Sequence, residues 1–116
     1  MKENKLADLS INFAIQIIEL VKVLKDKKEI IISNQIGRSG TSVGANIREA
    51  QYAHGKADFI AKLQIALKEA NETGYWLELL YKTNYLAQVE FEKLDKLCTE
   101  IRVVLIKSLN TAKENK

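Results

Sequence analysis

At 116 residues and 13.2 kDa, the chain has the size of one ordinary domain, and length alone argues against a second folded unit. It is 47% hydrophobic and 28% charged, too apolar for a disordered tail and too evenly mixed for a membrane protein. Lys and Arg exceed Asp and Glu by 18 − 15 = 3, a mild basic excess that permits contact with nucleic acid without requiring it.

Long helices are favoured over tight turns because proline is absent and glycine occurs only five times. Cys98 is the single cysteine and His54 the single histidine, so the sequence offers no intramolecular disulfide and no set of zinc ligands. We therefore expect a reducing, cytoplasmic setting. Charged and polar residues interrupt the apolar segment 6–24, which excludes a signal sequence or a transmembrane helix there.

The first half of the chain predicts two helices. Over 6–25, apolar residues recur at steps of three and four and share one helix face: Leu6, Leu9, Phe13, Ile17, Leu20 and Leu24. After a short polar connection the same spacing returns over 29–54, at Ile32, Ile36, Gly40, Val43, Ile47 and Ala50. Gly55 is expected to close this second helix in a left-handed conformation.

The second half predicts two more helices, over 58–83 and 89–112. Their apolar residues are Phe59, Leu63, Ala66, Ala70, Leu77 and Tyr81 in the third, and Phe91, Leu94, Cys98, Ile101, Leu105 and Leu109 in the fourth. Four amphipathic helices with short connections hide their apolar faces most simply in an all-α, up-down-up-down antiparallel bundle. We predict that residues 1–116 form one such domain.

Two helices carry more apolar surface than one core requires. The extra residues are Ile11, Ile15 and Ile18 in the first helix and Ile65, Trp76 and Leu79 in the third. An isolated monomer would leave them in water, so the sequence predicts a homo-oligomer with these residues at the interface. The alternative is that helix curvature tucks them into the same core.

The second helix combines a polar line with several glycines. The line consists of Gln35, Ser39, Ser42, Asn46 and Glu49, with Glu72 as a candidate partner on the third helix. Gly37, Gly40 and Gly44 each weaken the helix by roughly 1 kcal/mol relative to alanine, which indicates close approach by another group. The favoured interpretation is tight helix packing on the glycines with interhelical hydrogen bonds along the polar line. A ligand site is the alternative.

No catalytic, metal or cofactor site is predicted. Carboxylate-bridged di-metal bundles use Glu-x-x-His pairs, but Glu49 and Glu72 are followed at that spacing by Tyr52 and Tyr75. The glycines do not form a phosphate-binding loop, and His54 and Cys98 lie on different predicted elements. We therefore predict a non-enzymatic protein without a small-molecule substrate.

Basic residues outside the apolar stripes are the candidates for binding RNA or DNA. They are Lys22 and Lys25 near the end of the first helix and Arg38 and Arg48 on the second. Neighbouring acidic residues dilute the charge in one subunit, whereas an oligomer would repeat it. The alternative is that both arginines form ion pairs with carboxylates on a neighbouring helix or subunit.

The segment from Gln35 to Ala50 resembles a family of bacterial four-helix-bundle proteins encoded in 23S rRNA intervening sequences. That family has an Arg-Ser-x-x-Ser-hydrophobic-x-x-Asn-Ile-x-Glu-Ala/Gly motif in its second helix, which this chain matches from Arg38 to Ala50. Further matches follow at Asp58-Phe59, Ile65-Ala66 and Glu72, and in the apolar residues of the fourth helix. Glu69 departs from the small serine of many relatives, and the proline common before the second helix is missing.

The resemblance implies a cytoplasmic bundle, often a ring-shaped homopentamer, without known catalytic activity. It also implies nucleic-acid binding, through the association with ribosomal RNA inserts and kinship with basic pentameric accessory proteins of diversity-generating retroelements. Two functions stay open from the sequence. One is an oligomer that binds structured RNA or DNA through basic outer surfaces, and the other is a homo-oligomeric protein-interaction scaffold with no nucleic-acid role.

Overall fold

The computed structural model describes residues 4–114, and over that range the chain forms four α-helices and no β-strand. The helices are α1 (Lys5–Asp26), α2 (Ile31–Gln51), α3 (Lys56–Lys82) and α4 (Gln88–Glu114). The prediction of an all-α fold is therefore confirmed. Within the described residues, none of these helices is both long and apolar enough to cross a lipid bilayer.

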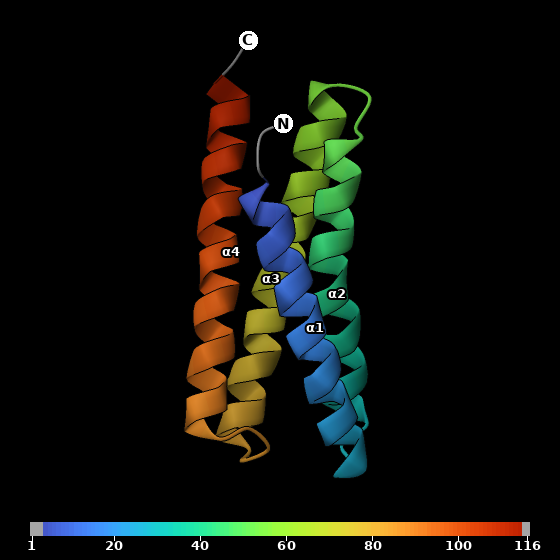
Figure 1. The fold of residues 1–116 in the computed structure, drawn as a ribbon, viewed down its shortest axis with the longest axis vertical. Coiled ribbons are helices and arrows are strands. Elements are labelled where there is room, and N and C mark those ends of the chain that lie inside the picture. Colours follow the sequence, from blue (N-terminus) through green and yellow to red (C-terminus); the bar gives the residue numbers. More distant parts are fainter. Residues whose placement is uncertain (1–3, 115–116) are drawn as a thin grey trace.

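The helices run alternately down and up in the view of Figure 1, joined by short turns at alternating ends. α2 and α3 share the most extensive contact, α1 packs on α2, and α4 packs on α3. The direct contact between α1 and α4 is the smallest of the four, because these two helices diverge towards the lower end of Figure 1. α2 and α3 are therefore the most closely associated pair of helices.

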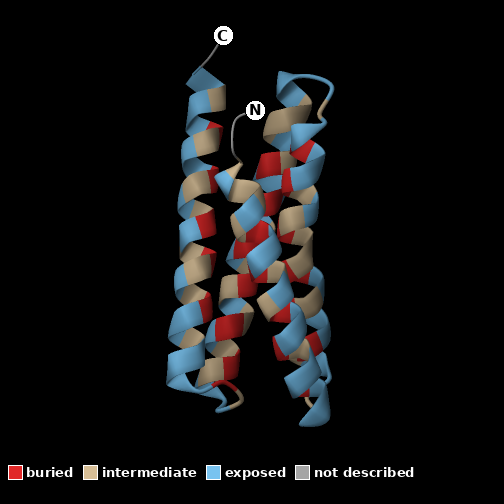
Figure 2. Cartoon of the chain, viewed as in Figure 1, coloured by how far each residue is buried: buried red, intermediate tan, exposed pale blue. Residues whose placement is uncertain are grey.

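The core follows the apolar periodicity of the sequence. Figure 2 shows the buried residues on the inward sides of the helices and exposed residues on the outside. Phe13, Ile17, Ile36, Leu77 and Leu105 are among the side chains with no solvent exposure. Leu6, Leu9 and Phe59 are only partly buried and pack at the edge of this cluster.

The helix ends explain where the structure differs from the expected boundaries. α2 is shorter at both ends than the expected range 29–54. Lys28 adopts a left-handed backbone conformation (φ 66°) before α2, and the Glu29 carboxylate accepts a hydrogen bond from the backbone N–H of Ser33 at 2.8 Å. At the other end, the N–H of Tyr52 closes a tight last turn onto the carbonyl of Glu49 at 3.1 Å.

The expectation for Gly55 was wrong. Its backbone is extended (φ −168°), and it precedes α3 as the N-cap residue instead of closing α2 in a left-handed conformation. The chain leaves α2 through Tyr52 and Ala53, whose N–H groups donate to the last carbonyls of that helix, so no left-handed residue is needed.

Candidate functional site

The glycines of α2 face α1. A Cβ atom added to Gly40 would lie only 2.9 Å from Cγ2 of Ile17, and one added to Gly44 would lie 3.1 Å from Oγ of Ser10. Ile17 and Ser10 are both buried in α1. The close neighbour that the glycines indicate is therefore α1, and Gly40 and Gly44 set the separation of the two helices.

A buried hydroxyl pair lies on the other side of α2, against α3. The Oγ atom of Ser39 and the Oγ1 atom of Thr73 are 2.8 Å apart, and both residues are fully buried. Thr73 donates its own hydroxyl hydrogen to the carbonyl of Glu69 at 2.8 Å, so Ser39 is the donor to Thr73. This chain of hydrogen bonds satisfies two polar groups that are otherwise surrounded by apolar side chains.

Immediately before Ser39 in the sequence and nearer the surface, Arg38 of α2 meets two carboxylates of α3. Its guanidinium donates to Glu69 at 3.1 Å and to Glu72, and the indole N–H of Trp76 also donates to Glu72, at 3.0 Å. The hydrogen bonds from Arg38 and then Trp76 hold the pKa of Glu72 below its ordinary value, and Glu72 and Glu69 raise that of Arg38. Arg38 is thus engaged by carboxylates within its own subunit.

The rest of the predicted polar line makes fewer contacts between helices. Ser42 donates to the carbonyl of Arg38, and Asn46 donates to the carbonyl of Ser42, so both side chains bond within α2. Glu49 reaches α3 through an ion pair with Lys62 at 3.7 Å. Gln35 is exposed to solvent. The residues of the line and its neighbour that join α2 to α3 are therefore Arg38, Ser39 and Glu49.

The other predicted basic residues lie in two separate places. Lys22 pairs with Glu19 at 3.4 Å and Lys25 donates to the Asn34 side chain at 3.0 Å, both near the turn between α1 and α2. Arg48 is exposed near the opposite end of α2. The structure does not bring these residues together into one patch on a single subunit.

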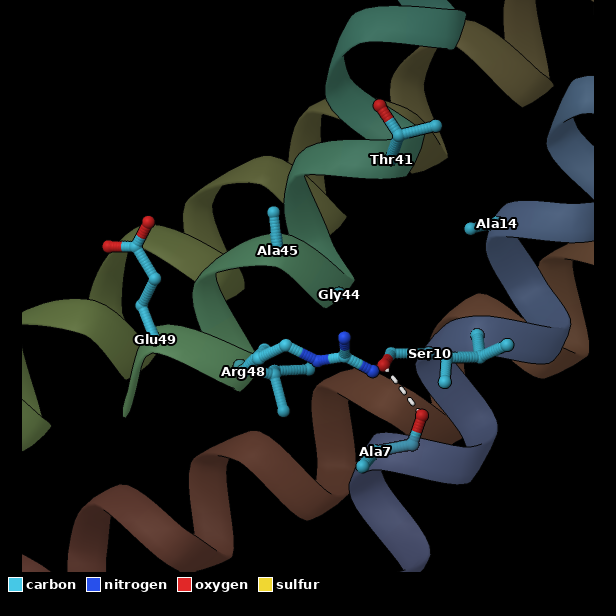
Figure 3. Close-up of a pocket in the computed structure, with 10 residues that line it drawn as sticks. Ala7, Ser10, Ala14, Thr41, Gly44, Ala45, Arg48 and Glu49 are labelled. Atoms are coloured by element: carbon cyan, nitrogen blue, oxygen red, sulfur yellow. Dashed lines mark hydrogen bonds between the residues drawn. The ribbon is translucent and has the colours of Figure 1, made fainter. Parts of the chain in front are cut away.

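Arg48 borders a shallow groove between α1 and α2, shown in Figure 3. The groove has a volume of about 450 Å³, and small residues form most of its wall: Ala7, Ser10, Ala14, Thr41, Gly44 and Ala45. Ser10 donates to the carbonyl of Ala7 at 2.8 Å and is buried, so its hydroxyl is already satisfied. The groove follows from the close approach of the two helices at Gly44 and presents Arg48 as its one cation.

The predicted interface residues divide into two groups. Ile11, Ile15 and Ile18 are 46%, 55% and 45% exposed and follow one face of α1. We call these three residues the α1 stripe. On α3, Ile65 is exposed, but Trp76 and Leu79 are only partly exposed, and Trp76 packs against the core.

The structure offers no chemically activated group among the described residues. Burial raises the pKa of the Cys98 thiol to about 11, and its Sγ donates to the carbonyl of Ala70 at 3.3 Å, so the thiol is neutral and shielded. Across residues 4–114, no three His, Cys, Asp or Glu side chains are grouped in a way that could hold a metal ion. Helix packing accounts for the polar residues in the interior.

Comparison with known proteins connects this architecture to a family. The signature of the 23S rRNA-intervening sequence protein matches residues 2–107. The chain belongs to that family. A crystal structure from Bacteroides thetaiotaomicron, described as a protein with unknown function from the S23 ribosomal protein family, is 52% identical and superposes with a TM-score of 0.88. The match covers 90% of this chain and 97% of the other, and no curated protein matches.

The family's description names no catalytic activity, and the related crystal structure is described as a protein with unknown function. Sequence reasoning had not identified Thr73 or Glu69 as partners of the second helix. Thr73 could have indicated this contact, because it is a polar residue within the buried series Ala66, Ala70, Thr73 and Leu77 of α3. A hydroxyl inside an apolar stripe requires a hydrogen-bond partner, and Ser39 is the matching residue on the facing helix.

Proposed function

We propose that this 23S rRNA-intervening sequence protein is a non-enzymatic, self-associating, antiparallel up-down-up-down bundle. The α1 stripe is the observation that carries the proposal. Three isoleucines, each about half exposed, repeat at helical spacing on one side of α1. Burial of large apolar side chains between subunits is favourable by roughly 25 cal/mol per Å² of apolar surface. A second copy that covers the stripe therefore gains stability.

A second apolar patch supports contact between unlike surfaces. Val103 and Ile106 of α4 are also about half exposed, on a different helix from the α1 stripe. If the α1 stripe of one copy packs against the α4 patch of the next, each copy contacts one neighbour through its α1 stripe and another through its α4 patch. Such head-to-tail contacts close into a ring when the rotation between copies allows it. The family resemblance makes five copies our expected number.

Light scattering tests the assembly. We expect a mass close to that of a pentamer of the 13.2 kDa chain at micromolar concentration, and a smaller species for the variant Ile15→Asp/Ile18→Asp. Tyr52→Asp is the matched control, because Tyr52 is 80% exposed and lies outside the stripe. A wild-type mass of 13.2 kDa would contradict self-association, and an unchanged oligomer in the double variant would move the interface elsewhere.

RNA binding is the second proposed function, and the turn between α1 and α2 favours it. Four exposed lysines surround this turn: Lys22, Lys25, Lys27 and Lys28. The family's description refers to intervening sequences of 23S rRNA, which makes structured RNA the first nucleic acid to test. A ring would repeat the basic turn in every subunit. Because phosphate contacts release counterions, the affinity should then fall steeply with salt.

A filter-binding titration separates this function from the scaffold alternative. Replacing Lys22, Lys25 and Lys27 by glutamine should weaken retention of ribosomal RNA and flatten the salt dependence without changing oligomer size. Replacing Lys93, Lys96 and Lys107 on α4 removes the same charge elsewhere and serves as the control. Arg38 is left intact because Glu69 and Glu72 already neutralise it. Absence of RNA and DNA retention at about 50 mM salt would leave the protein-interaction scaffold as the function.

A further inference from the structure

The bundle has only three walls at one end. α1 begins at Lys5, whose ammonium group lies 4.0 Å from the carboxylate of Glu100, whereas α4 continues to Glu114. The part of α4 beyond Glu100 extends for about 20 Å at 1.5 Å per residue. Figure 1 shows α1 starting well short of the upper ends of the other three helices. Among residues 4–114, none fills the place that a fourth helix would occupy between α2, α3 and α4.

A groove of about 860 Å³ lies at this end of the bundle. Its wall comes from the end of α2, the following turn, the first turn of α3 and the last turns of α4, with no residue of α1. Ala50, Ala53, Phe59 and Ala112 supply its apolar surface. Phe59 packs against the core from this side and is only partly buried, because no α1 residue covers it here. We call this feature the end groove.

The charged side chains that line the end groove are positive. Within the described part of the chain, Lys56 and Lys107 are the only ionisable residues that line it, and both are exposed. Neither lysine forms an ion pair with any residue in the range 4–114, whereas the nearby Asp58 pairs with Lys62 at 3.6 Å. Ser108, Thr111 and Gln51 add neutral hydrogen-bonding groups at the rim. An occupant with carboxylates beside apolar side chains would complement this surface.

We propose that the end groove docks a short acidic amphipathic helix of a partner protein, which takes the place of the missing fourth wall. Its apolar side chains would cover Phe59 and the alanines, while its carboxylates would lie against Lys56 and Lys107. This is the helix-in-groove mode of recognition, in which residues at i, i+3, i+4 and i+7 anchor the peptide. The volume is large enough for several such side chains, at the upper end of the range for ligand pockets.

The apolar wall distinguishes this occupant from nucleic acid. A phosphate backbone would use the two lysines but would leave Phe59 and the alanines uncovered. A second copy of the chain is disfavoured because the surfaces proposed for self-association, the α1 stripe and the patch of Val103 and Ile106, do not line the end groove. An acidic partner helix satisfies both the apolar and the charged parts of the site.

Peptide titration of the full-length protein tests the proposal. The probe is a fluorescent helical peptide of about four turns with leucines on one face and glutamates on the other, compared with a peptide that carries lysines in place of the glutamates. We expect the acidic peptide to bind at least about tenfold more tightly than the basic one. Amide chemical shifts in the NMR spectrum should change at residues 50–59 and 107–112.

Two variants of the groove and one control complete the experiment. Lys56→Glu/Lys107→Glu should weaken the acidic peptide by about tenfold or more, and Ala112→Trp should block the groove without changing its charge. Lys22→Glu/Lys27→Glu makes the same charge change at the opposite end and should leave affinity within about twofold. Circular dichroism checks that each variant keeps its helices.

Several outcomes would overturn the proposal. They are absence of acidic-peptide binding at about 1 mM, equal weakening by the groove and control variants, or shift changes on the α1 stripe instead of the end groove. Two further outcomes assign the site to another occupant. One is an RNA duplex that binds the groove residues more tightly than the acidic peptide, and the other is loss of self-association in the Lys56→Glu/Lys107→Glu variant.

Discussion

The hydroxyl groups of Ser39 and Thr73 lie 2.8 Å apart in the buried contact between α2 and α3, and Ser39 is the donor. Ser39→Ala should lower the free energy of unfolding by about 1 kcal/mol, because Thr73 keeps its bond to the Glu69 carbonyl. Thr73→Val should cost about 2 kcal/mol, because it strands the buried Ser39 hydroxyl. Urea unfolding at one protein concentration measures both effects.

The double variant Ser39→Ala/Thr73→Val tests the coupling. Removing both hydroxyls leaves no stranded donor, so the double variant should be less destabilised than the sum of the single variants. Additive losses would show that the two hydroxyls do not depend on each other.

Replacing a glycine by alanine should lower the stability of the protein at Gly40 of α2 and raise it at Gly74 of α3. Gly40→Ala would place a Cβ atom 2.9 Å from Ile17, and we expect a loss of about 1–3 kcal/mol from overpacking. Gly74→Ala meets nothing closer than the Sγ of Cys98 at 4.0 Å, so the higher helix propensity of alanine should stabilise α3 by up to about 1 kcal/mol. Thermal unfolding followed by circular dichroism compares the two. A stabilised Gly40→Ala variant would contradict the close packing of α1 on α2.

Truncation of the core should be far more damaging than truncation of the surface. Phe13→Ala and Leu105→Ala each remove a side chain with no solvent exposure and should cost about 3 kcal/mol. Val89 is 75% exposed, and its replacement by alanine should change stability by less than about 0.5 kcal/mol. Chemical denaturation measures all three. Losses below about 0.5 kcal/mol at both core positions would show that the core is assigned incorrectly.

The interaction between Arg38 and Glu72 should make stability depend on pH in the acid range. Because the native pKa of Glu72 is lowered, its contribution is present above the ordinary pKa of about 4.3 and disappears as pH falls through the lower native value. Arg38→Gln removes the hydrogen bond that is the largest cause of the lowered pKa of Glu72. The stability difference between wild type and variant should therefore shrink as pH falls from about 7 to about 3. A difference independent of pH would assign the effect to packing of the Arg38 side chain.

Helix positions and buried faces were largely predictable, whereas partners across the helices were not. Phe13 and Ile17 in α1 and Leu105 in α4 belong to apolar series that repeat at the helical period. The sequence alone therefore places them on the inward faces of their helices. The pairing of Ser39 with Thr73 depends on how far α3 slides along α2, which the turn at residues 52–55 sets. The contact of Arg38 with Glu69 and Glu72 shows the same limit, since it also depends on how α3 is placed along α2.

The order of helix contacts has a consequence for how the chain folds. The most extensive contacts join helices that are neighbours in sequence, and the contact between α1 and α4, which are farthest apart in the chain, is the smallest of the four. Each helical hairpin can therefore form after closure of a short loop, before the chain ends meet. Folds dominated by such local contacts reach the native state within milliseconds or faster, and little unprotected apolar surface accumulates on the way.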